Sequence, residues 1–286
     1  MPASESQPRV SVIVLTLNEE LTLPFCLASV RNLHAEIFVV DSGSSDRTVE
    51  IATAAAARVV THPFANYAAQ RNWAQENLPL RGEWILQLDA DERLLPELVD
   101  EINARLAGDC PADAFLINRR TIFRGRWMRH GAHYPVAHLR LYRKGKGWCE
   151  HRLYDQHFLT SGTTARLRHD FEDHVGTDLK EWTTRHARWA ELEAAEACGE
   201  RGAEGATVTP HVFGDTRERR RWQRDRIYAH APLFVRAFAY WFYRYVLRGG
   251  FLDGTEGLIF HFLQGFWFRF LVDANIHERR RGARTA

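Results

Sequence analysis

Residues 84–92 have the sequence Trp84-Ile85-Leu86-Gln87-Leu88-Asp89-Ala90-Asp91-Glu92, an apolar run that ends in acids. A short run rich in branched apolar residues is typical of a buried strand. In α/β sheets, ligands bind at the carboxyl ends of the strands, so these acids lie where a ligand is expected. Side chains two residues apart on an extended segment point to the same side. Asp89 and Asp91 can therefore contact one ligand.

The pair Asp89 and Asp91 offers only oxygen ligands. Such ligands suit a hard divalent cation, Mg²⁺ or Mn²⁺, that is shared with the phosphates of a substrate. The alternative is a polar junction between the strand and a helix that begins near Pro96, because Asp-x-Asp is a common tripeptide. The segments before this strand favour the metal site.

Apolar runs and helical patterns alternate along the first half of the chain. Strands are expected at 10–15, 36–40, 58–61, 84–89 and 114–118, with helices between them. This alternation, with its short connections, predicts an α/β fold built on a parallel, doubly wound sheet. Three of the strands are followed by polar clusters: Thr16, Asn18 and Glu19; Asp41 and Ser42; Asp89 and Asp91. If these strand ends converge at one edge of the sheet, they form one pocket.

Composition narrows the class of protein. The chain has 286 residues, 45% hydrophobic and 26% charged, which is typical of a globular protein with room for one large domain or a domain plus an appendage. The net charge of +2 does not indicate a nucleic-acid binder. The cysteines are scattered, without a C-x-x-C pair, which disfavours a zinc site and favours reduced thiols in the cytoplasm. The N-terminal residues also lack a signal-peptide pattern.

Four motifs occur in a distinctive order: Thr16-Leu17-Asn18-Glu19-Glu20, then VVDSGSSDRT at 39–48, Arg71-Asn72, and LDADE at 88–92. Together they resemble the inverting glycosyltransferases of family 2 over residues 9 to 175. The resemblance implies a GT-A fold, a Rossmann-like nucleotide-sugar-binding domain, which we assign to residues 1–175. Residues 176–286 are then expected to form a separate helical C-terminal region.

The resemblance also implies roles for individual residues. Thr16, Asn18 and Glu19 would line the nucleotide site, and Asp41 would contact the base, with Ser42 and Arg71 also in the nucleotide-sugar site. Asp89 would lie near the ribose or uracil, and Asp91 would hold Mg²⁺ or Mn²⁺ on the diphosphate. A bound cation stabilises the charge that develops on a departing diphosphate. For Asp41 and Ser42, turn formation and helix capping remain the alternative.

Direct displacement at a sugar carbon also needs a general base that takes the proton of the acceptor hydroxyl. In relatives that act on lipopolysaccharide core sugars, Val-His-Glu supplies an acid after the strand equivalent to the one at Arg140. This chain has Leu153-Tyr154-Asp155 in that place, so Asp155 is the first candidate base and Glu150 the second. For either acid, an ion pair with a neighbouring Arg or Lys is the alternative.

The C-terminal third combines arginines with aromatic residues. A basic run from Arg217 to Arg226 precedes two apolar, aromatic stretches at 232–248 and 257–272. Arginines interrupt both stretches, whereas a membrane-spanning helix needs about 20 mostly uncharged residues. Helices of this composition are typical of a membrane interface, and the basic run would attract anionic headgroups. The alternatives are packing on the first domain and a dimer interface.

These features predict a metal-dependent inverting glycosyltransferase of the hexosyltransferase class. It would move a sugar, from a UDP-sugar in our interpretation, onto a glycan or glycolipid of the cell envelope, in lipopolysaccharide or exopolysaccharide synthesis. The expected location is the cytoplasm, peripheral on the cytoplasmic face of the inner membrane, with no nucleic-acid partner. A sugar-nucleotide pyrophosphorylase would need a Gly-rich basic loop after the first strand, where this chain has Thr16-Leu17-Asn18-Glu19-Glu20. A non-catalytic, membrane-associated scaffold with a degenerate nucleotide fold is the other alternative.

Overall fold

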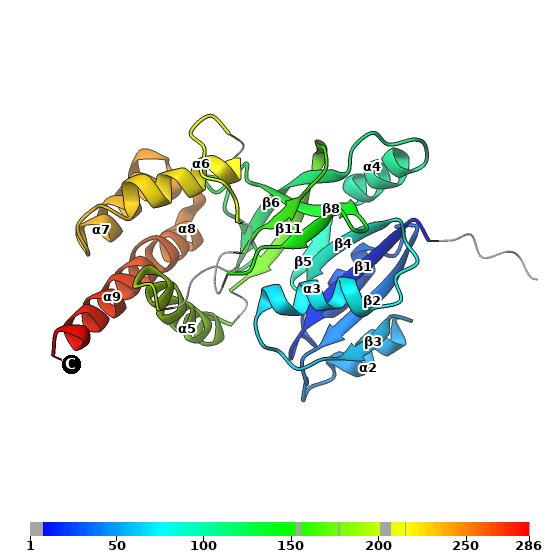
Figure 1. Ribbon diagram of the computed structural model, residues 1–286, viewed down its shortest axis with the longest axis horizontal. Helices are drawn as coiled ribbons and strands as arrows, with labels where there is room; N and C mark the ends of the chain where they lie inside the picture. The colour runs from blue at the N-terminus through cyan, green and yellow to red at the C-terminus, as the bar shows by residue number, and fades with distance from the viewer. Residues whose placement is uncertain (1–7, 153–155, 177, 201–206, 215, 286) are drawn as a thin grey trace, which may run out of the picture. The chain divides into compact units, whose positions relative to one another are not determined.

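The computed structural model describes residues 8–152, 156–176, 178–200, 207–214 and 216–285 (Figure 1). Asp155 lies outside these residues. The chain divides into two compact units that do not follow a single cut. Unit 1 contains the described residues of 1–118, 138–149 and 157–173, and unit 2 contains those of 119–137, 150–156 and 174–286.

Unit 1 is built on a sheet with the strand order β3-β2-β1-β4-β8-β6-β11-β5. The pairings β1–β2, β2–β3 and β1–β4 are parallel, whereas β8 is antiparallel to β4 and β5 to β11. The strands are β1 (Val10–Thr16), β2 (Ala35–Asp41), β3 (Arg58–Thr61), β4 (Trp84–Asp89), β5 (Glu92–Leu94), β6 (Ala114–Phe123), β8 (Ala137–Arg143) and β11 (Thr164–Val175). A separate two-stranded sheet pairs β9 (Gly147–Cys149) with β10 (Phe158–Thr160).

The helices of unit 1 cover both faces of this sheet (Figure 1). They are α1 (Leu23–Ser29), α2 (Thr48–Ala54), α3 (Tyr67–Asn77) and α4 (Pro96–Leu106). Alternate residues of β1 point to opposite faces: Val12 and Val14 belong to the core cluster that includes α1 and α4. Ile13 and Leu15 belong to the cluster on the α3 side. Burial on both faces explains the unbroken apolar sequence of β1.

Strand register brings the polar strand ends together. Thr16 pairs with Asp41 across β1 and β2, and Leu15 pairs with Asp89 across β1 and β4. The loops that follow β1, β2 and β4 therefore leave the sheet at the same edge. This mostly parallel sheet with flanking helices confirms the fold class expected from the sequence.

Unit 2 is mainly helical, which confirms the expected helical C-terminal region. Its main elements are β7 (Arg126–Trp127), α5 (Leu179–Ala197), α6 (Thr216–Gln223), η1 (Arg224–Tyr228), α7 (Val235–Phe242), η2 (Tyr243–Leu247), η3 (Gly250–Asp253), α8 (Gly254–Phe260), η4 (His261–Trp267) and α9 (Phe268–Thr285). Helices α5 and α9 lie side by side (Figure 1). Ala190 and Ala194 of α5 belong to one buried cluster with Phe268 and Val272 of α9. Within the described part of the chain, no helix has both the length and the apolar character needed to cross a membrane.

Candidate active site

The loops that follow β1 and β2 are joined to each other by hydrogen bonds. Asn18 has a φ of +56°, in the left-handed region that Asn adopts more readily than most residues. Its side-chain Oδ1 accepts the N–H of Ser45 at 2.8 Å, and its own N–H donates to Ser44 Oγ at 2.8 Å. Glu19 adds a third link, since its N–H donates to Thr48 Oγ1 at 2.7 Å. The two loops form one preformed surface at the edge of the sheet.

Asp41 is buried and holds its own loop in shape. Its Oδ2 accepts the N–H groups of Gly43 and Ser44, each at 2.9 Å, and its Oδ1 accepts the hydroxyl of Thr16 at 3.1 Å. Gly43 has a φ of +98°, which favours glycine at this turn. Asp41 therefore forms the turn that the sequence left open as an alternative, and Thr16 supports it.

Ser42 links the same loop to α3. Its hydroxyl oxygen accepts the amide N–H of Gln70 at 3.3 Å. Gln70 also lies 2.7 Å from His62 Nδ1, and the ring of His62 stacks on Trp73 with 3.7 Å between centroids. An aromatic and polar wall thus stands beside the loop that contains Ser42.

Asp89, at the end of β4, is held between two guanidinium groups. Arg71 Nη2 donates to its Oδ1 at 2.5 Å, and Arg140 Nη2 donates to its Oδ2 at 3.2 Å. Burial alone would raise the pKa of Asp89, but the charges of Arg71 and Arg140 lower it below its usual value. Both guanidiniums lie over the ring of Phe158, at 5.2 and 5.7 Å from its centroid. Asp89 is therefore an ionised, ion-paired carboxylate.

Glu92 supports this arrangement from within the sheet. It is buried, and its Oε2 accepts the N–H of Asp89 at 2.9 Å, while its Oε1 accepts from Arg140. Burial raises the pKa of Glu92 to about 7, although Arg140 opposes the shift. Arg71 and Arg140 each keep one buried nitrogen, Nη1 and Nε, without a hydrogen-bond partner among the described residues.

Asp91 differs from Asp89, because it forms no hydrogen bond or ion pair with the described residues. Burial raises the pKa of Asp91 well above its usual value, and four neighbouring carboxylates raise it further. In order of effect, these are Asp173, Asp89, Glu19 and Glu92. A carboxylate surrounded by others is a favourable position for a divalent cation, whose charge would offset the repulsion.

The donor set at this edge fits Mg²⁺ or Mn²⁺ shared with a diphosphate. Within the described ranges, no three His, Cys, Asp or Glu side chains form a complete metal cage. Mg²⁺ seldom uses such a cage, since it binds through one or two carboxylates together with substrate phosphates and water. Asp91, with Asp89 two residues before it, satisfies that requirement.

Asp173 is a residue of this cluster that the sequence did not single out as a site. It lies on β11 and pairs in register with Glu92 of β5. It is buried, and its charge contributes to the raised pKa values of both Asp91 and Glu92. In the sequence, Asp173 is one of several acids in the run that includes Asp170 and Glu172. The strand pairing that brings Asp173 close to Glu92 joins segments about 80 residues apart, so a local sequence pattern does not predict it.

Glu150 belongs to unit 2 and is fully buried there. Its Oε1 accepts Arg221 Nη2 at 2.7 Å, and its Oε2 accepts the N–H of Val208 at 3.1 Å. Both carboxylate oxygens are thus used inside the unit. The ion pair with an arginine is the alternative that the sequence left open for this acid.

Comparisons with known proteins identify the family of the chain. The family model described as "Glycosyl transferase family 2" matches residues 11–174. An uncharacterized glycosyltransferase of Rickettsia bellii is 40% identical over 94 residues, 33% of this chain and 31% of that protein. The lipopolysaccharide core biosynthesis glycosyltransferase LpsC of Rhizobium meliloti is 32% identical over 143 residues, 48% of this chain and 52% of that protein. The chain spans about a third to a half of the length of these curated relatives.

Among solved structures, TarS 1-349 of S. aureus is similar with a TM-score of 0.49 and 15% identity, covering 96% of this chain and 92% of that one. Similarity at this level carries neither a donor nor an acceptor over to this chain. The family model, by contrast, covers more than half of the 286 residues and spans all four motifs, which confirms the resemblance and the GT-A fold. The chain belongs to glycosyl transferase family 2.

Proposed function

We propose that unit 1 transfers a sugar, with inversion, from a UDP-sugar to a glycan or glycolipid of the cell envelope. The observation that supports this most directly is Asp91, a carboxylate that has no hydrogen-bond or ion-pair partner among the described residues and is repelled by neighbouring carboxylates. It lies at the edge where the loops after β1, β2 and β4 leave the sheet. The similarity to LpsC, named for lipopolysaccharide core biosynthesis, supports the class of acceptor.

The residues at this edge have different roles in binding the donor. Asn18, Glu19 and Ser42 form the nucleotide surface, and the buried Thr16 and Asp41 hold its loops in shape. Asp91, with Asp89 beside it, would hold Mg²⁺ or Mn²⁺, and the cation would stabilise the charge on the leaving diphosphate. Arg71 and Arg140, fixed by Asp89, add positive charge close to the same position.

The proton of the acceptor hydroxyl needs a base on the same side of the donor. The sequence proposed Asp155 first and Glu150 second. We favour Asp173 over both, because its charge acts on Asp91 in the carboxylate cluster. Both carboxylate oxygens of Glu150 instead accept hydrogen bonds within unit 2. In this proposal Asp173 takes the proton as the bond between the sugar and the diphosphate breaks.

Calorimetric titration with UDP and with GDP, each with and without Mn²⁺, tests the donor site. Wild-type protein should bind UDP in a metal-dependent manner. Asp91→Asn should lose the metal dependence, and its turnover of a UDP-sugar should fall about a thousandfold, because a cation at a leaving diphosphate supplies several kcal/mol. Asp100→Asn removes an exposed acid from α4 of the same unit and should behave as wild type. Metal-dependent UDP binding that survives in Asp91→Asn would refute the assignment.

A second proposal concerns unit 2, which we infer attaches the protein to the cytoplasmic face of the inner membrane. Several large apolar side chains between 235 and 252 are exposed: Val235, Phe238, Phe242, Leu247, Phe251 and Leu252. Arg236 and Arg244, in the same segment, are buried instead. A surface that turns its apolar residues outward and its arginines inward is typical of an interaction site, and exposed aromatic helices favour a membrane interface. Failure of the protein to float with lipid vesicles would remove this proposal.

A further inference from the structure

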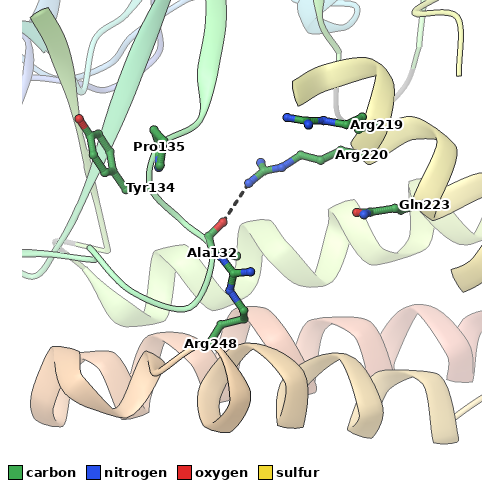
Figure 2. A pocket seen from close by; sticks show the side chains of 7 residues that line it. All are labelled: Ala132, Tyr134, Pro135, Arg219, Arg220, Gln223 and Arg248. Carbon is green, nitrogen blue, oxygen red and sulfur yellow. Dashed lines mark hydrogen bonds between the residues drawn. The ribbon is translucent and has the colours of Figure 1, made fainter. Parts of the chain in front are cut away.

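Unit 2 contains a hollow of about 300 Å³ whose lining is rich in arginine (Figure 2). One wall is the loop that carries Ala132, Tyr134 and Pro135. Arg219 and Arg220 enter from α6, and Arg248 enters from the end of η2. Among the described residues that line the hollow, none is acidic.

The loop wall is held in a fixed shape by arginines of two helical segments. Gly131 O accepts Arg244 Nε at 2.7 Å, and Ala132 O accepts Arg220 Nη2 at 2.9 Å (Figure 2). The N–H of Gly131 donates to the carbonyl of Arg248 at 3.0 Å. Ala132 has a φ of +58°, a conformation that non-glycine residues keep only where the surroundings impose it. The loop wall of the hollow is therefore preformed.

Positive charge is concentrated at this hollow. Among the described residues, the side chain of Arg219 forms no hydrogen bond or ion pair, and that of Arg248 forms one hydrogen bond, to Tyr243 Oη at 3.5 Å. Tyr134, in the loop wall, packs edge-on against the ring of Trp127. The guanidiniums of Arg120 and Arg129 lie 4.7 and 5.3 Å from the centroid of the Trp127 ring. The guanidiniums of Arg219 and Arg248, which form no ion pair with a described residue, suit a phosphate, because its oxygens accept paired hydrogen bonds from arginine.

Exposed apolar side chains flank Arg248, a lining residue of the hollow, in the chain. Leu247, immediately before Arg248 in the chain, is 66% exposed, and Phe251 and Leu252, just after it, are 50% and 56% exposed. Inorganic phosphate has no apolar part that could contact these side chains. In a phospholipid, the headgroup can sit among the arginines while the acyl chains cover the leucines and the phenylalanine.

We propose that this hollow binds the phosphate group of an anionic membrane lipid. The inference rests on the proposed membrane attachment. Binding through a diffuse basic patch would depend only on the surface charge of the membrane, whereas this site binds the phosphate of one lipid at a defined position. The headgroup is held by Arg219, Arg220 and Arg248, and the bound lipid fixes the orientation of unit 2 on the leaflet.

The test compares two double variants by vesicle flotation, using vesicles of phosphatidylcholine alone and of phosphatidylcholine with phosphatidic acid. Arg219→Gln/Arg248→Gln removes two charges from the hollow. Arg226→Gln/Arg280→Gln removes two exposed charges of unit 2 that do not line it. The hollow variant should lose affinity for phosphatidic acid vesicles about tenfold or more relative to the control variant, as expected for charge-assisted hydrogen bonds.

Each outcome decides a different point. An equal loss of affinity for phosphatidic acid vesicles in both variants would overturn the lipid-phosphate site, because general electrostatic attraction would then explain the binding. Equal binding of wild type to both kinds of vesicle would keep membrane attachment and overturn the lipid-phosphate site. If wild type ignores vesicles but binds inorganic phosphate through Arg219 and Arg248, the lipid is the wrong source. Binding to neither would overturn this inference and the membrane proposal together, while leaving the donor site of unit 1 untouched.

Discussion

Unit 1 and unit 2 both bury charged side chains, but they balance these charges differently. In unit 2, four of the buried charges form two ion pairs, Arg236 with Asp273 and Arg221 with Glu150. In unit 1 the carboxylates around Asp91 outnumber the guanidiniums that reach them, and Asp91 itself is unpaired among the described residues. An ion pair compensates the charges that it buries, whereas an uncompensated carboxylate cluster costs stability. Such a cost is expected where a ligand supplies the missing charge.

The largest expected effect concerns catalysis in unit 1. Asp173→Asn should keep metal-dependent UDP binding but slow UDP release from a UDP-sugar by about 10²–10⁴-fold, because the variant cannot accept the proton of the acceptor. Asp155→Asn and Glu150→Gln are the matched comparisons, measured in the same assay. If Asp155→Asn is slow and Asp173→Asn is near wild type, the base is Asp155 and the cluster serves the metal alone.

The next effect concerns stability in unit 2. Asp273 is fully buried, and it accepts Arg236 Nε at 2.7 Å and the N–H of Phe234 at 2.7 Å. Asp273→Asn should lower the free energy of unfolding by about 3–5 kcal/mol, since it leaves a buried guanidinium without its counter-charge. Urea denaturation in the absence of divalent cations measures this loss.

Asp91→Asn provides the contrast in the same denaturation experiment. Because the wild-type carboxylate is repelled by its neighbours, removing its charge should leave stability unchanged or increase it. A large loss of stability in Asp91→Asn, or none in Asp273→Asn, would break the distinction between the two units.

A further effect is a dependence of stability on pH in unit 2. His186 and His261 are buried, and burial, with neighbouring arginines Arg185 and Arg244, lowers the pKa of each to about 4. The folded state thus keeps both rings neutral below pH 6.5, where the unfolded chain takes up protons. The free energy of unfolding should be constant above about pH 6.5 and fall toward pH 4, by up to roughly 3 kcal/mol for each ring.

Hydrogen exchange of the α8 and η4 peptides across this pH range measures the loss. His261→Gln should flatten the profile, whereas His230→Gln, which changes an exposed histidine, should not. An unchanged profile in His261→Gln would show that another group controls the acid sensitivity.

Much of unit 1 could be predicted from the sequence because its signals are local. The unbroken apolar run at 10–15 and the run that ends in Asp89 predicted buried strands, and the structure confirms them. The polar residues after three strands could be placed at one edge because parallel strands share a direction. Asp173 could not be found in this way, since its position depends on the register between β11 and β5.

The segment 235–247 of unit 2 was harder to predict, because all its residues except Arg236 and Arg244 are apolar or aromatic. A helical pattern identifies the inward face only when polar and apolar residues separate clearly. Arg236 and Arg244 therefore appeared to interrupt an outward-facing surface, whereas the structure buries both. Likewise, the partner of Glu150 is Arg221, 71 residues further along the chain, a contact that no local spacing reveals.

The joined loops after β1 and β2 have a consequence for the speed of donor exchange. Side-chain oxygens of Asn18 and Asp41 already accept hydrogen bonds from the backbone of Gly43, Ser44 and Ser45. The loops are therefore already ordered before a nucleotide binds. Ordering a side chain on association costs about 0.5–1.5 kcal/mol, and a rigid surface avoids most of that cost. The association rate of a nucleotide would then depend on diffusion and on the charge near Asp91, and hardly on loop closure.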